Sequence, residues 1–355
     1  MKLTILILSF NRPKELRKKI EFWNNFENYN YTILIVDGSP TPSFFNIKNK
    51  NIKYIHFKSR DYHKRVFYVI KHINTDYFKL ESDDDYFLPS SLQNAIKYLD
   101  KNKNYSAVYG EAGIYSVYNN KLYINHIFKK KLDLDSNNFK KRLTSYFLNQ
   151  NYSPKLYYSL MRTTFFKKNV ELWKRSKKKY GNKFQRFAEI HLPLTLLMSG
   201  KIKIFNQIFW IRKDDDIKKR VEFTSNKRLI KNDHSYLNIS IWSLENIKTG
   251  YFDFFGKSLC KITNNKKYYS KFIVHEILNN YYLNSVNKSK KNTSIKEKLY
   301  KSLKEVLPIK LKKFIRFQFK LNGPEIKKCD EFKIKFGVNY KILELKYLKS
   351  ILIKK

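Results

Sequence analysis

The first hundred residues alternate short apolar runs with amphipathic segments. The apolar runs predict strands covered on both faces, because each is short, continuous and bounded by polar turn residues. These predicted strands lie at residues 3–9, 31–36, 52–57 and 77–81. The amphipathic segments predict helices at residues 13–26, 61–73 and 89–99. Strands separated by helices imply right-handed crossovers, so we expect an α/β domain with a mostly parallel sheet flanked by helices.

The pattern changes after residue 110. Two alternating runs separated by Asn119 and Asn120 predict a β-hairpin. The other predicted elements are a strand at 107–110, a helix at 139–148, a strand at 156–161, a helix at 184–197 that ends near Gly200, and a strand at 202–211.

Beyond about residue 217 the chain becomes Lys-rich and its segments read mainly as helices. This shift in composition predicts a boundary near residue 215. We therefore expect an α/β domain over residues 1–215, with one half at 1–112 and another at 113–215. Residues 216–355 are predicted to form a mainly helical, basic C-terminal extension.

The chain has 355 residues and a net charge of +43, from 73 Lys and Arg against 30 Asp and Glu. With 42% hydrophobic and 17% aromatic residues it can bury a core, which excludes wholesale disorder. The positive charge predicts attraction to a polyanion, such as nucleic acid, an anionic membrane or a phosphorylated substrate. The abundance of Asn, Ile and Tyr indicates AT-rich coding, which raises the Lys content without a functional cause and weakens that inference.

Two features favour a cytoplasmic location. Cys260 and Cys329 lie far apart, without the spacing of a zinc site or a disulfide framework, which fits a reducing compartment. The apolar run at residues 3–8 is too short for a membrane span and is not followed by a signal-peptide cleavage site. No later run has the length of a transmembrane helix, so we expect a cytoplasmic protein without a membrane span.

The segment at residues 288–321 is rich in Lys and Arg with interleaved Leu, Ile and Phe, and Pro308 predicts a break between two helices. A basic amphipathic helix of this kind predicts binding to an anionic membrane surface, here the inner face of the cytoplasmic membrane. An ordinary packed helix and a nucleic-acid platform are the alternatives. Because no RRM, KH, zinc-finger or helix-turn-helix pattern is present, no nucleic-acid partner is expected.

Four carboxylates lie at the C-terminal end of the predicted strand at 77–81, in the run Glu81-Ser82-Asp83-Asp84-Asp85. The carboxyl ends of strands are where open α/β sheets bind ligands. Clustered carboxylates repel one another unless a cation neutralises them, and hard oxygen ligands suit Mg²⁺ or Mn²⁺. A solvated acidic turn is the alternative. A second run, Asp214-Asp215-Asp216, is surrounded by Lys and Arg and is interpreted as self-neutralised surface charge, with an acceptor-binding or lid role as the lesser option.

Three motifs carry a resemblance to a known family. They are Ser9-Phe10-Asn11-Arg12-Pro13, Ile35-Val36-Asp37-Gly38-Ser39 and the acidic run at residues 81–85. In this order and spacing they resemble the nucleotide-sugar half of GT-A glycosyltransferases of the family 2 type. The resemblance implies a GT-A (Rossmann-like) fold, a nucleotide-sugar half at 1–112, an acceptor half at 113–215, and Mn²⁺ or Mg²⁺ as cofactor.

The resemblance also implies roles for single residues. Ser9, Phe10, Asn11 and Arg12 would line the pocket of the nucleotide base, and Asp37 would accept hydrogen bonds from the base or ribose. Asp83 would bind the ribose and also the metal, Asp85 would bind the metal, and Asp84 would be a second contact. For Asn11 a plain helix cap, and for Asp37 a plain turn aspartate, are the alternatives.

Lys64 and Arg65 stand near the start of a predicted helix, where a basic pair and the helix N-terminus together favour phosphate. They are candidates for contacts with the diphosphate of the donor. In so basic a chain, a solvated surface is the alternative for both residues.

An inverting transfer needs a general base that takes the proton from the acceptor hydroxyl. By resemblance that base is an acidic residue opening a helix on the acceptor side, and Glu189 stands at the matching place, although the family's Glu-Asp pair is Glu-Ile here. An exposed helix glutamate is the alternative. His191 could be the base or a metal ligand instead, although a lone His is more often a packed polar residue.

Together these features predict a metal-dependent, inverting glycosyltransferase that moves a sugar from a nucleotide-sugar donor to a cell-surface glycan, carried on a lipid. One alternative is a basic nucleic-acid-binding protein without catalysis. Another is a nucleotidyl- or phospho-sugar transferase that uses the same fold and metal site. The acidic run discriminates against the first alternative, because a pure binder gains nothing from carboxylates that face its polyanion.

Overall fold

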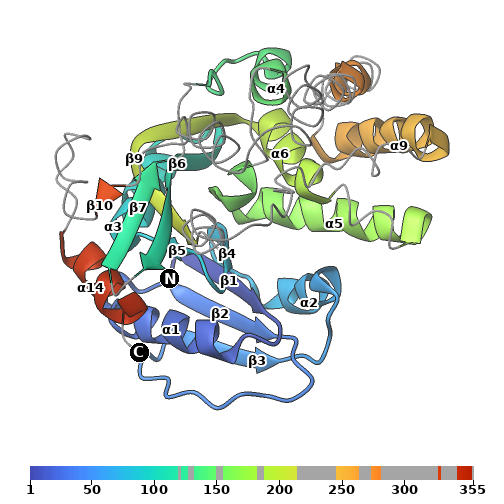
Figure 1. The fold of residues 1–355 in the computed structure, drawn as a ribbon. Helices are drawn as coiled ribbons and strands as arrows, with labels where there is room; N and C mark the ends of the chain where they lie inside the picture. Colours follow the sequence, from blue (N-terminus) through green and yellow to red (C-terminus); the bar gives the residue numbers. More distant parts are fainter. Residues whose placement is uncertain are drawn as a thin grey trace, which may run out of the picture.

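The computed structural model of the protein describes residues 1–118, 121–126, 132–148, 155–181, 188–213, 245–263, 273–280, 327–328 and 342–353. The described strands belong to one sheet, shown with its surrounding helices in Figure 1.

The N-terminal half is built on four parallel strands. In spatial order these are β4 (Tyr77–Ser82), β1 (Leu3–Ser9), β2 (Thr32–Asp37) and β3 (Ile52–His56). The helices of this half are α1 (Pro13–Asn24), α2 (Tyr62–Val69) and α3 (Pro89–Lys101), with the 3-10 turns η1 (Glu27–Tyr29) and η2 (Ile70–His72) and the short strand β5 (Tyr86–Phe87). The predicted α/β arrangement with parallel strands is confirmed.

Local sequence explains why these elements form where they do. Strand β1 lies between β4 and β2, and its residues Leu3, Ile5 and Ile7 have no exposed surface. Helix α1 has Pro13 in its first turn, where a fixed φ is compatible with helix geometry. Helix α2 is capped by Asp61, whose carboxylate accepts hydrogen bonds from the backbone N–H groups of residues 63 and 64.

The second half contains one long strand where the sequence predicts two. Strand β6 (Tyr105–Tyr118) runs without interruption, because β9 (Lys201–Lys213) pairs with it in parallel and β7 (Lys121–His126) pairs with its last part in antiparallel register. Tyr118 lies opposite Lys121, so the hairpin predicted around Asn119 and Asn120 is confirmed by its flanking strands.

The segment at 156–161, expected to be a strand, divides into two elements. It begins in the 3-10 turn η3 (Lys155–Tyr158) and continues into β8 (Leu160–Arg162). Strand β8 runs antiparallel to both β4 and β6, between which it lies, so the complete sheet is mixed. The helices of this half are α4 (Phe139–Phe147), α5 (Thr163–Tyr180) and α6 (Ala188–Ser199).

Described elements of the predicted extension pack on this α/β body. Helix α9 (Glu245–Thr263) lies against α5 and α6, and β10 (Lys327–Lys328) pairs with β7. Helix α14 (Ile342–Ile353) lies beside α1 and β7, at the lower left of Figure 1. The predicted boundary at residue 215 stays a prediction, and the basic segment 288–321 lies outside the described residues.

Helix α14 is anchored by Glu344. Its carboxylate accepts hydrogen bonds of 2.8 Å from both the backbone N–H and the hydroxyl of Ser90, and one of 3.2 Å from the Tyr29 hydroxyl. Ser90 is in the first turn of α3, where backbone N–H groups lack helical partners and a negative charge is favourable.

Among the helices that the structure describes, none has both the length and the apolar content of a membrane span.

Candidate active site

The three polar motifs meet at one edge of the sheet. In the parallel register, Ser9 on β1 lies opposite Asp37 on β2, and Leu8 lies opposite Ser82 on β4. The residues that follow these strands therefore emerge side by side at the carboxyl edge. This is the edge at which open α/β sheets bind ligands.

Asp37 holds the turn that follows β2. Its carboxylate accepts hydrogen bonds from the Ser39 backbone N–H at 3.0 Å, the Ser39 hydroxyl at 2.5 Å and the Tyr54 hydroxyl at 2.8 Å. Gly38 is required here, because a Cβ atom would lie 2.3 Å from the carbonyl oxygen of Ser59. Asp37 therefore has the turn-stabilising role that the sequence analysis gave as the alternative. Its contact with the base or ribose stays a prediction.

The loop after β1 takes an unusual backbone conformation at Asn11. This residue has a positive φ of 54°, which Asn tolerates better than most residues, and its N–H donates to the Ser39 hydroxyl at 2.9 Å. Arg12, rather than Asn11, precedes helix α1, and its side chain makes no capping bond. Asn11 is thus not a helix cap. It is exposed at the edge, with Phe10 half-buried beside it.

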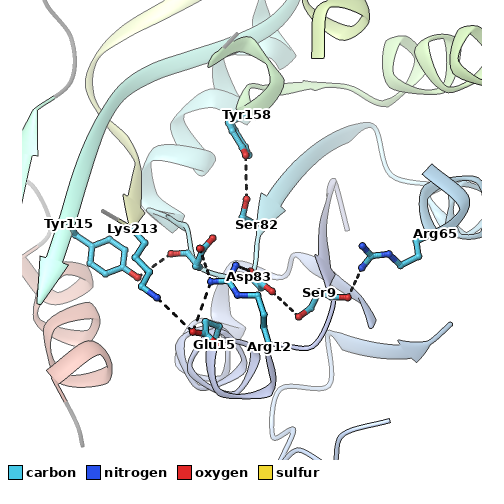
Figure 2. Close-up of polar contacts among 10 residues, drawn as sticks. Ser9, Arg12, Glu15, Arg65, Ser82, Asp83, Tyr115, Tyr158 and Lys213 are labelled. Atoms are coloured by element: carbon cyan, nitrogen blue, oxygen red, sulfur yellow. Dashed lines mark hydrogen bonds and ion pairs between the residues drawn. The ribbon is translucent and has the colours of Figure 1, made fainter. Parts of the chain in front are cut away.

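Arg12 forms ion pairs with two of the three aspartates. Its guanidinium donates to Asp83 Oδ1 and Asp84 Oδ2, at 2.8 Å in each case. The Ser9 hydroxyl donates to Asp83 Oδ2 at 2.8 Å, so both carboxylate oxygens of Asp83 are hydrogen-bonded (Figure 2). Burial raises the pKa of the Asp83 carboxyl, and the charge of Arg12 opposes that rise. Charge-assisted bonds from a planar guanidinium fix the orientation of both carboxylates.

Further contacts surround this group. Glu15 lies 4.0 Å from the guanidinium of Arg12 and 3.7 Å from the ammonium of Lys213 at the end of β9. The Tyr115 hydroxyl of β6 donates to the carbonyl oxygen of Asp84 at 3.1 Å (Figure 2). The second half of the fold therefore contributes directly to the position of the acidic motif.

Asp85 differs from its two neighbours. It is 3% exposed, and in the described part of the chain no donor is hydrogen-bonded to its carboxylate. Burial, together with the negative charge of Asp84, raises the pKa of Asp85 to about 7. The positive charges of Arg212 and Lys19 oppose this rise, although neither is hydrogen-bonded to the carboxylate.

The basic pair of helix α2 is divided between two environments. Arg65 is buried and donates to the carbonyl oxygen of Ser9, and its Cδ lies 2.9 Å from where a Cβ on Gly38 would be. Lys64 is exposed, and its backbone N–H donates to the Asp61 carboxylate at 3.2 Å. Arg65 thus braces the ends of β1 and β2, whereas the ammonium of Lys64 is at the surface.

The sequence matches one protein-family model over residues 4–185, and the description of that model is glycosyl transferase family 2. The chain belongs to this family. The matched range contains all three motifs, so the resemblance to family 2 glycosyltransferases is confirmed. The protein is therefore an enzyme, and its class of activity is glycosyl transfer. A search of curated proteins finds no significant match.

Solved structures with a similar fold include two of TarS from S. aureus. The crystal structure of TarS 1–349 in complex with UDP-GlcNAc is 12% identical, with a TM-score of 0.46, and the alignment covers 79% of this chain and 73% of that chain. The structure of TarS 1–349 in complex with UDP is also 12% identical, with a TM-score of 0.39 and coverage of 83% and 92%. Membership of the family rests on the family model.

In this family 2 glycosyltransferase, Glu189 is in the first turn of α6, as the sequence predicts for the base. Its side chain lies outside what the structure describes, so its role stays a prediction. His191 on the same helix is fully buried, with Nε2 hydrogen-bonded to the Tyr251 hydroxyl and its ring stacked on Phe255 at 4.2 Å between centroids. Burial holds the pKa of His191 well below its usual value. This geometry favours the packed polar residue over the base or metal ligand.

A divalent metal would find one suitable carboxylate at this edge. Among the described residues, no three His, Cys, Asp or Glu side chains form a cluster that could hold a metal ion. Arg12 is hydrogen-bonded to Asp83 and Asp84, whereas Asp85 is buried without a hydrogen-bonded cation among the described residues. A carboxylate with oxygens available as hard ligands suits Mg²⁺ or Mn²⁺, so the residues fit a metal held through Asp85. The second acidic run, at residues 214–216, lies outside the described residues.

Two further residues near this edge were not expected from the sequence. The Tyr158 hydroxyl lies 3.3 Å from the Ser82 hydroxyl, and the Tyr158 carbonyl oxygen accepts a hydrogen bond from Lys79 Nζ. Lys79 is fully buried on β4, with Nζ 3.5 Å from the centroid of the Phe87 ring, and burial holds its pKa well below the usual value. The sequence does contain a signal for Lys79, because a lysine stands among the apolar residues of a predicted buried strand. No local signal indicates Tyr158, whose position depends on the pairing of β8 with β4.

Proposed function

We propose that this glycosyltransferase moves a sugar from a nucleotide-sugar donor to a cell-surface glycan in a metal-dependent, inverting reaction. The observation that carries the proposal is the convergence of Ser9, Arg12 and Asp83 beside Asp37 at the carboxyl edge of the sheet. A nucleotide needs hydrogen-bond acceptors for its base and ribose, and these carboxylates supply them. The same edge would place the diphosphate beside Asp85.

The roles of the donor-side residues follow from their surroundings. Asp37 and Asp83 are held by neutral hydroxyls and a guanidinium, so they stay oriented as acceptors for ribose hydroxyls. Asp85 would hold Mn²⁺ or Mg²⁺, whose charge, when it is bound, offsets the negative charge that develops on the departing diphosphate. Arg65 contacts the ends of β1 and β2 at Ser9 and Gly38, and would thereby help to hold the shape of the base pocket.

On the acceptor side, Glu189 would take the proton from the attacking hydroxyl as that oxygen bonds to the anomeric carbon of the donor sugar. Attack opposite the departing diphosphate inverts the configuration at this carbon. The position of Glu189 in the first turn of α6 supports this role.

The acceptor is proposed to be a lipid-linked glycan at the inner face of the cytoplasmic membrane. The net charge of +43 and the basic, aromatic-containing sequence at 288–321 support attraction to an anionic surface. Flotation with vesicles of phosphatidylglycerol and phosphatidylcholine would test this, and binding should weaken as salt concentration rises. Retention on purely zwitterionic vesicles, unchanged by salt, would contradict it.

The donor proposal is tested by thermal shift with nucleoside diphosphates and nucleotide sugars, each with and without Mn²⁺. Because a ligand that binds only the folded state raises its stability, one nucleotide family should raise the Tm, and Mn²⁺ should increase the shift. Product formation with the same nucleotide sugar and a glycan acceptor, followed by NMR of the new linkage, then reports inversion. Stabilisation by nucleic acid alone would support the basic binding protein, and turnover of a nucleoside triphosphate with a sugar phosphate would support the nucleotidyltransferase.

A further inference from the structure

The hydroxyls of Tyr158 and Ser82 lie beside the acidic motif but belong to different halves of the fold. Ser82 is the last residue of β4 and directly precedes Asp83, whereas Tyr158 ends η3 in the second half. Both residues are partly exposed, and their hydroxyl oxygens are 3.3 Å apart (Figure 2). A ligand group that reached this pair would therefore contact both halves of the fold.

Tyr158 is held in place by groups other than Ser82. Its carbonyl oxygen accepts a hydrogen bond from Nζ of the buried Lys79, and its ring stacks on Trp210 with 4.8 Å between centroids. Trp210 is 2% exposed, stacks on Phe87 at 5.9 Å and donates to the Tyr109 hydroxyl at 3.0 Å. The position of the Tyr158 hydroxyl is thus set by a packed aromatic group before any ligand arrives.

The hydrogen bond between the two hydroxyls is long. O–H···O bonds in proteins are usually about 2.7–2.8 Å, so a separation of 3.3 Å indicates a weak bond that costs little to replace. A serine hydroxyl can donate once and accept twice, and a tyrosine hydroxyl can both donate and accept. Both hydroxyls can therefore exchange this weak bond for one to a ligand hydroxyl, next to a half-buried aromatic ring.

We propose that Ser82 and Tyr158 form the subsite that recognises the transferred sugar of the donor, through one of the hydroxyls of that sugar. This assignment rests on the proposed function, because it places the sugar next to a nucleotide bound at Asp83. The chemistry of the pair suits an uncharged, hydroxylated ring, since both groups are neutral and each can donate and accept. The subsite determines affinity for the sugar and contributes nothing to affinity for the nucleoside diphosphate.

Isothermal titration with Mn²⁺ present tests this through two affinities measured on the same protein. The probes are UDP with UDP-GlcNAc, GDP with GDP-mannose, and dTDP with dTDP-glucose, and the pair that the wild-type chain binds is used. Tyr158→Phe and Ser82→Ala should each weaken binding of the nucleotide sugar about 10-fold, while binding of the free diphosphate changes less than 2-fold. Tyr157→Phe is the matched control, because the Tyr157 hydroxyl contacts the Tyr62 hydroxyl instead, and it should change neither affinity.

The outcomes separate the subsite from the function on which it rests. Equal weakening of both ligands, or no weakening of the nucleotide sugar in either variant, overturns the subsite while the proposed function stands. Failure of the wild-type chain to bind any of the six nucleotides overturns the proposed function and the subsite with it. Ser82→Ala keeps the test decisive if Tyr158→Phe disturbs the aromatic group, since Ser82 takes no part in that stacking.

Discussion

Lys19 of α1 and Glu81 of β4 form an ion pair in which both side chains are fully buried, with Nζ 2.7 Å from Oε1. The indole N–H of Trp23 donates to the other oxygen of Glu81 at 3.3 Å. Glu81 begins the acidic run of the sequence, yet its carboxylate is paired with Lys19 and so links α1 to the sheet. Within the acidic run at residues 81–85, the three aspartates therefore remain for a ligand at the carboxyl edge.

Replacing Glu81 by Gln should strongly destabilise the protein. The ammonium of Lys19 would stay buried without a counter-charge, which typically costs about 3–5 kcal/mol of unfolding free energy. Urea unfolding of Glu81→Gln measures the loss. The double variant Lys19→Met with Glu81→Gln should recover part of it, because no buried charge remains. A double variant less stable than the single one would contradict this account.

Replacing Arg12 by Gln should affect both stability and donor binding. Asp83 is 4% exposed and would lose its cationic partner, so the unfolding free energy should fall by about 1–3 kcal/mol. Binding of the nucleoside diphosphate should weaken because Asp83 and Asp84 lose their fixed orientation. Calorimetric titration and urea unfolding measure the two effects. Glu15→Gln, which removes a contact at 4.0 Å from the same guanidinium, is the control and should change little.

Asp85→Asn should remove the effect of metal on nucleotide binding. Because Asp85 has a pKa of about 7, the wild-type protein should gain Mn²⁺-dependent stabilisation by nucleoside diphosphate as the pH rises through that value. The variant should show none at any pH. Without ligands the sign is opposite: the folded state holds this proton more tightly, so the contribution of Asp85 to the unfolding free energy falls as pH rises from about 4 to 7. Thermal shift across this range, with and without Mn²⁺, separates the two effects, and a variant that still responds to Mn²⁺ excludes Asp85 as the ligand.

Glu189→Gln should lower turnover on the order of 10²–10⁴-fold while donor affinity stays within about 2-fold, because a glutamine keeps the size of the side chain but not its basicity. Steady-state transfer and equilibrium binding of the donor measure the two quantities. His191→Gln is the comparison: its buried contacts with Tyr251 and Phe255 predict lower stability with turnover retained. Full activity in Glu189→Gln, with loss of activity in a folded His191→Gln protein, would reverse the assignment.

The stability of the protein should fall in mild acid through His63. Burial lowers the pKa of this side chain from 6.5 to about 4, so the unfolded chain binds the proton more readily than the folded one. Unfolding free energy is therefore lost as pH falls from about 6.5 toward 4. Urea unfolding at several pH values should show a shallower slope for His63→Gln than for the wild-type protein. Parallel pH profiles for the two proteins would show that this histidine does not contribute.

The sequence pattern predicts the N-terminal half of the fold well because its information is local. Apolar runs specify β1, β2 and β4, Asp61 specifies the start of α2, and parallel strands necessarily bring the residues after them to one edge. That geometry is enough to predict that the loop after Ser9, Asp37 and the acidic run lie together.

Features that depend on pairing between distant segments could not be predicted in this way. Strand β6 is continuous because β9 pairs along it, and Tyr158 reaches Ser82 because β8 pairs antiparallel with β4. The guanidinium of Arg12 points toward Asp83 rather than toward solvent. The periodicity of apolar residues does not predict such a side-chain conformation. His191 illustrates the same limit, since its environment is created by α9 from a later part of the chain.

The anchoring of α14 has a consequence for the order of folding. Glu344 is separated from Ser90 by 254 residues and from Tyr29 by 315, so these contacts close very large loops of chain. Closing such loops costs more entropy than pairing β1 with β2, and contacts of large sequence separation slow folding. The parallel strands can therefore assemble first, with the N-terminus of α3 still lacking its carboxylate. Docking of α14 then becomes a late step, in which Glu344 near the C-terminal end of the chain binds the first turn of α3, the helix that follows the acidic motif.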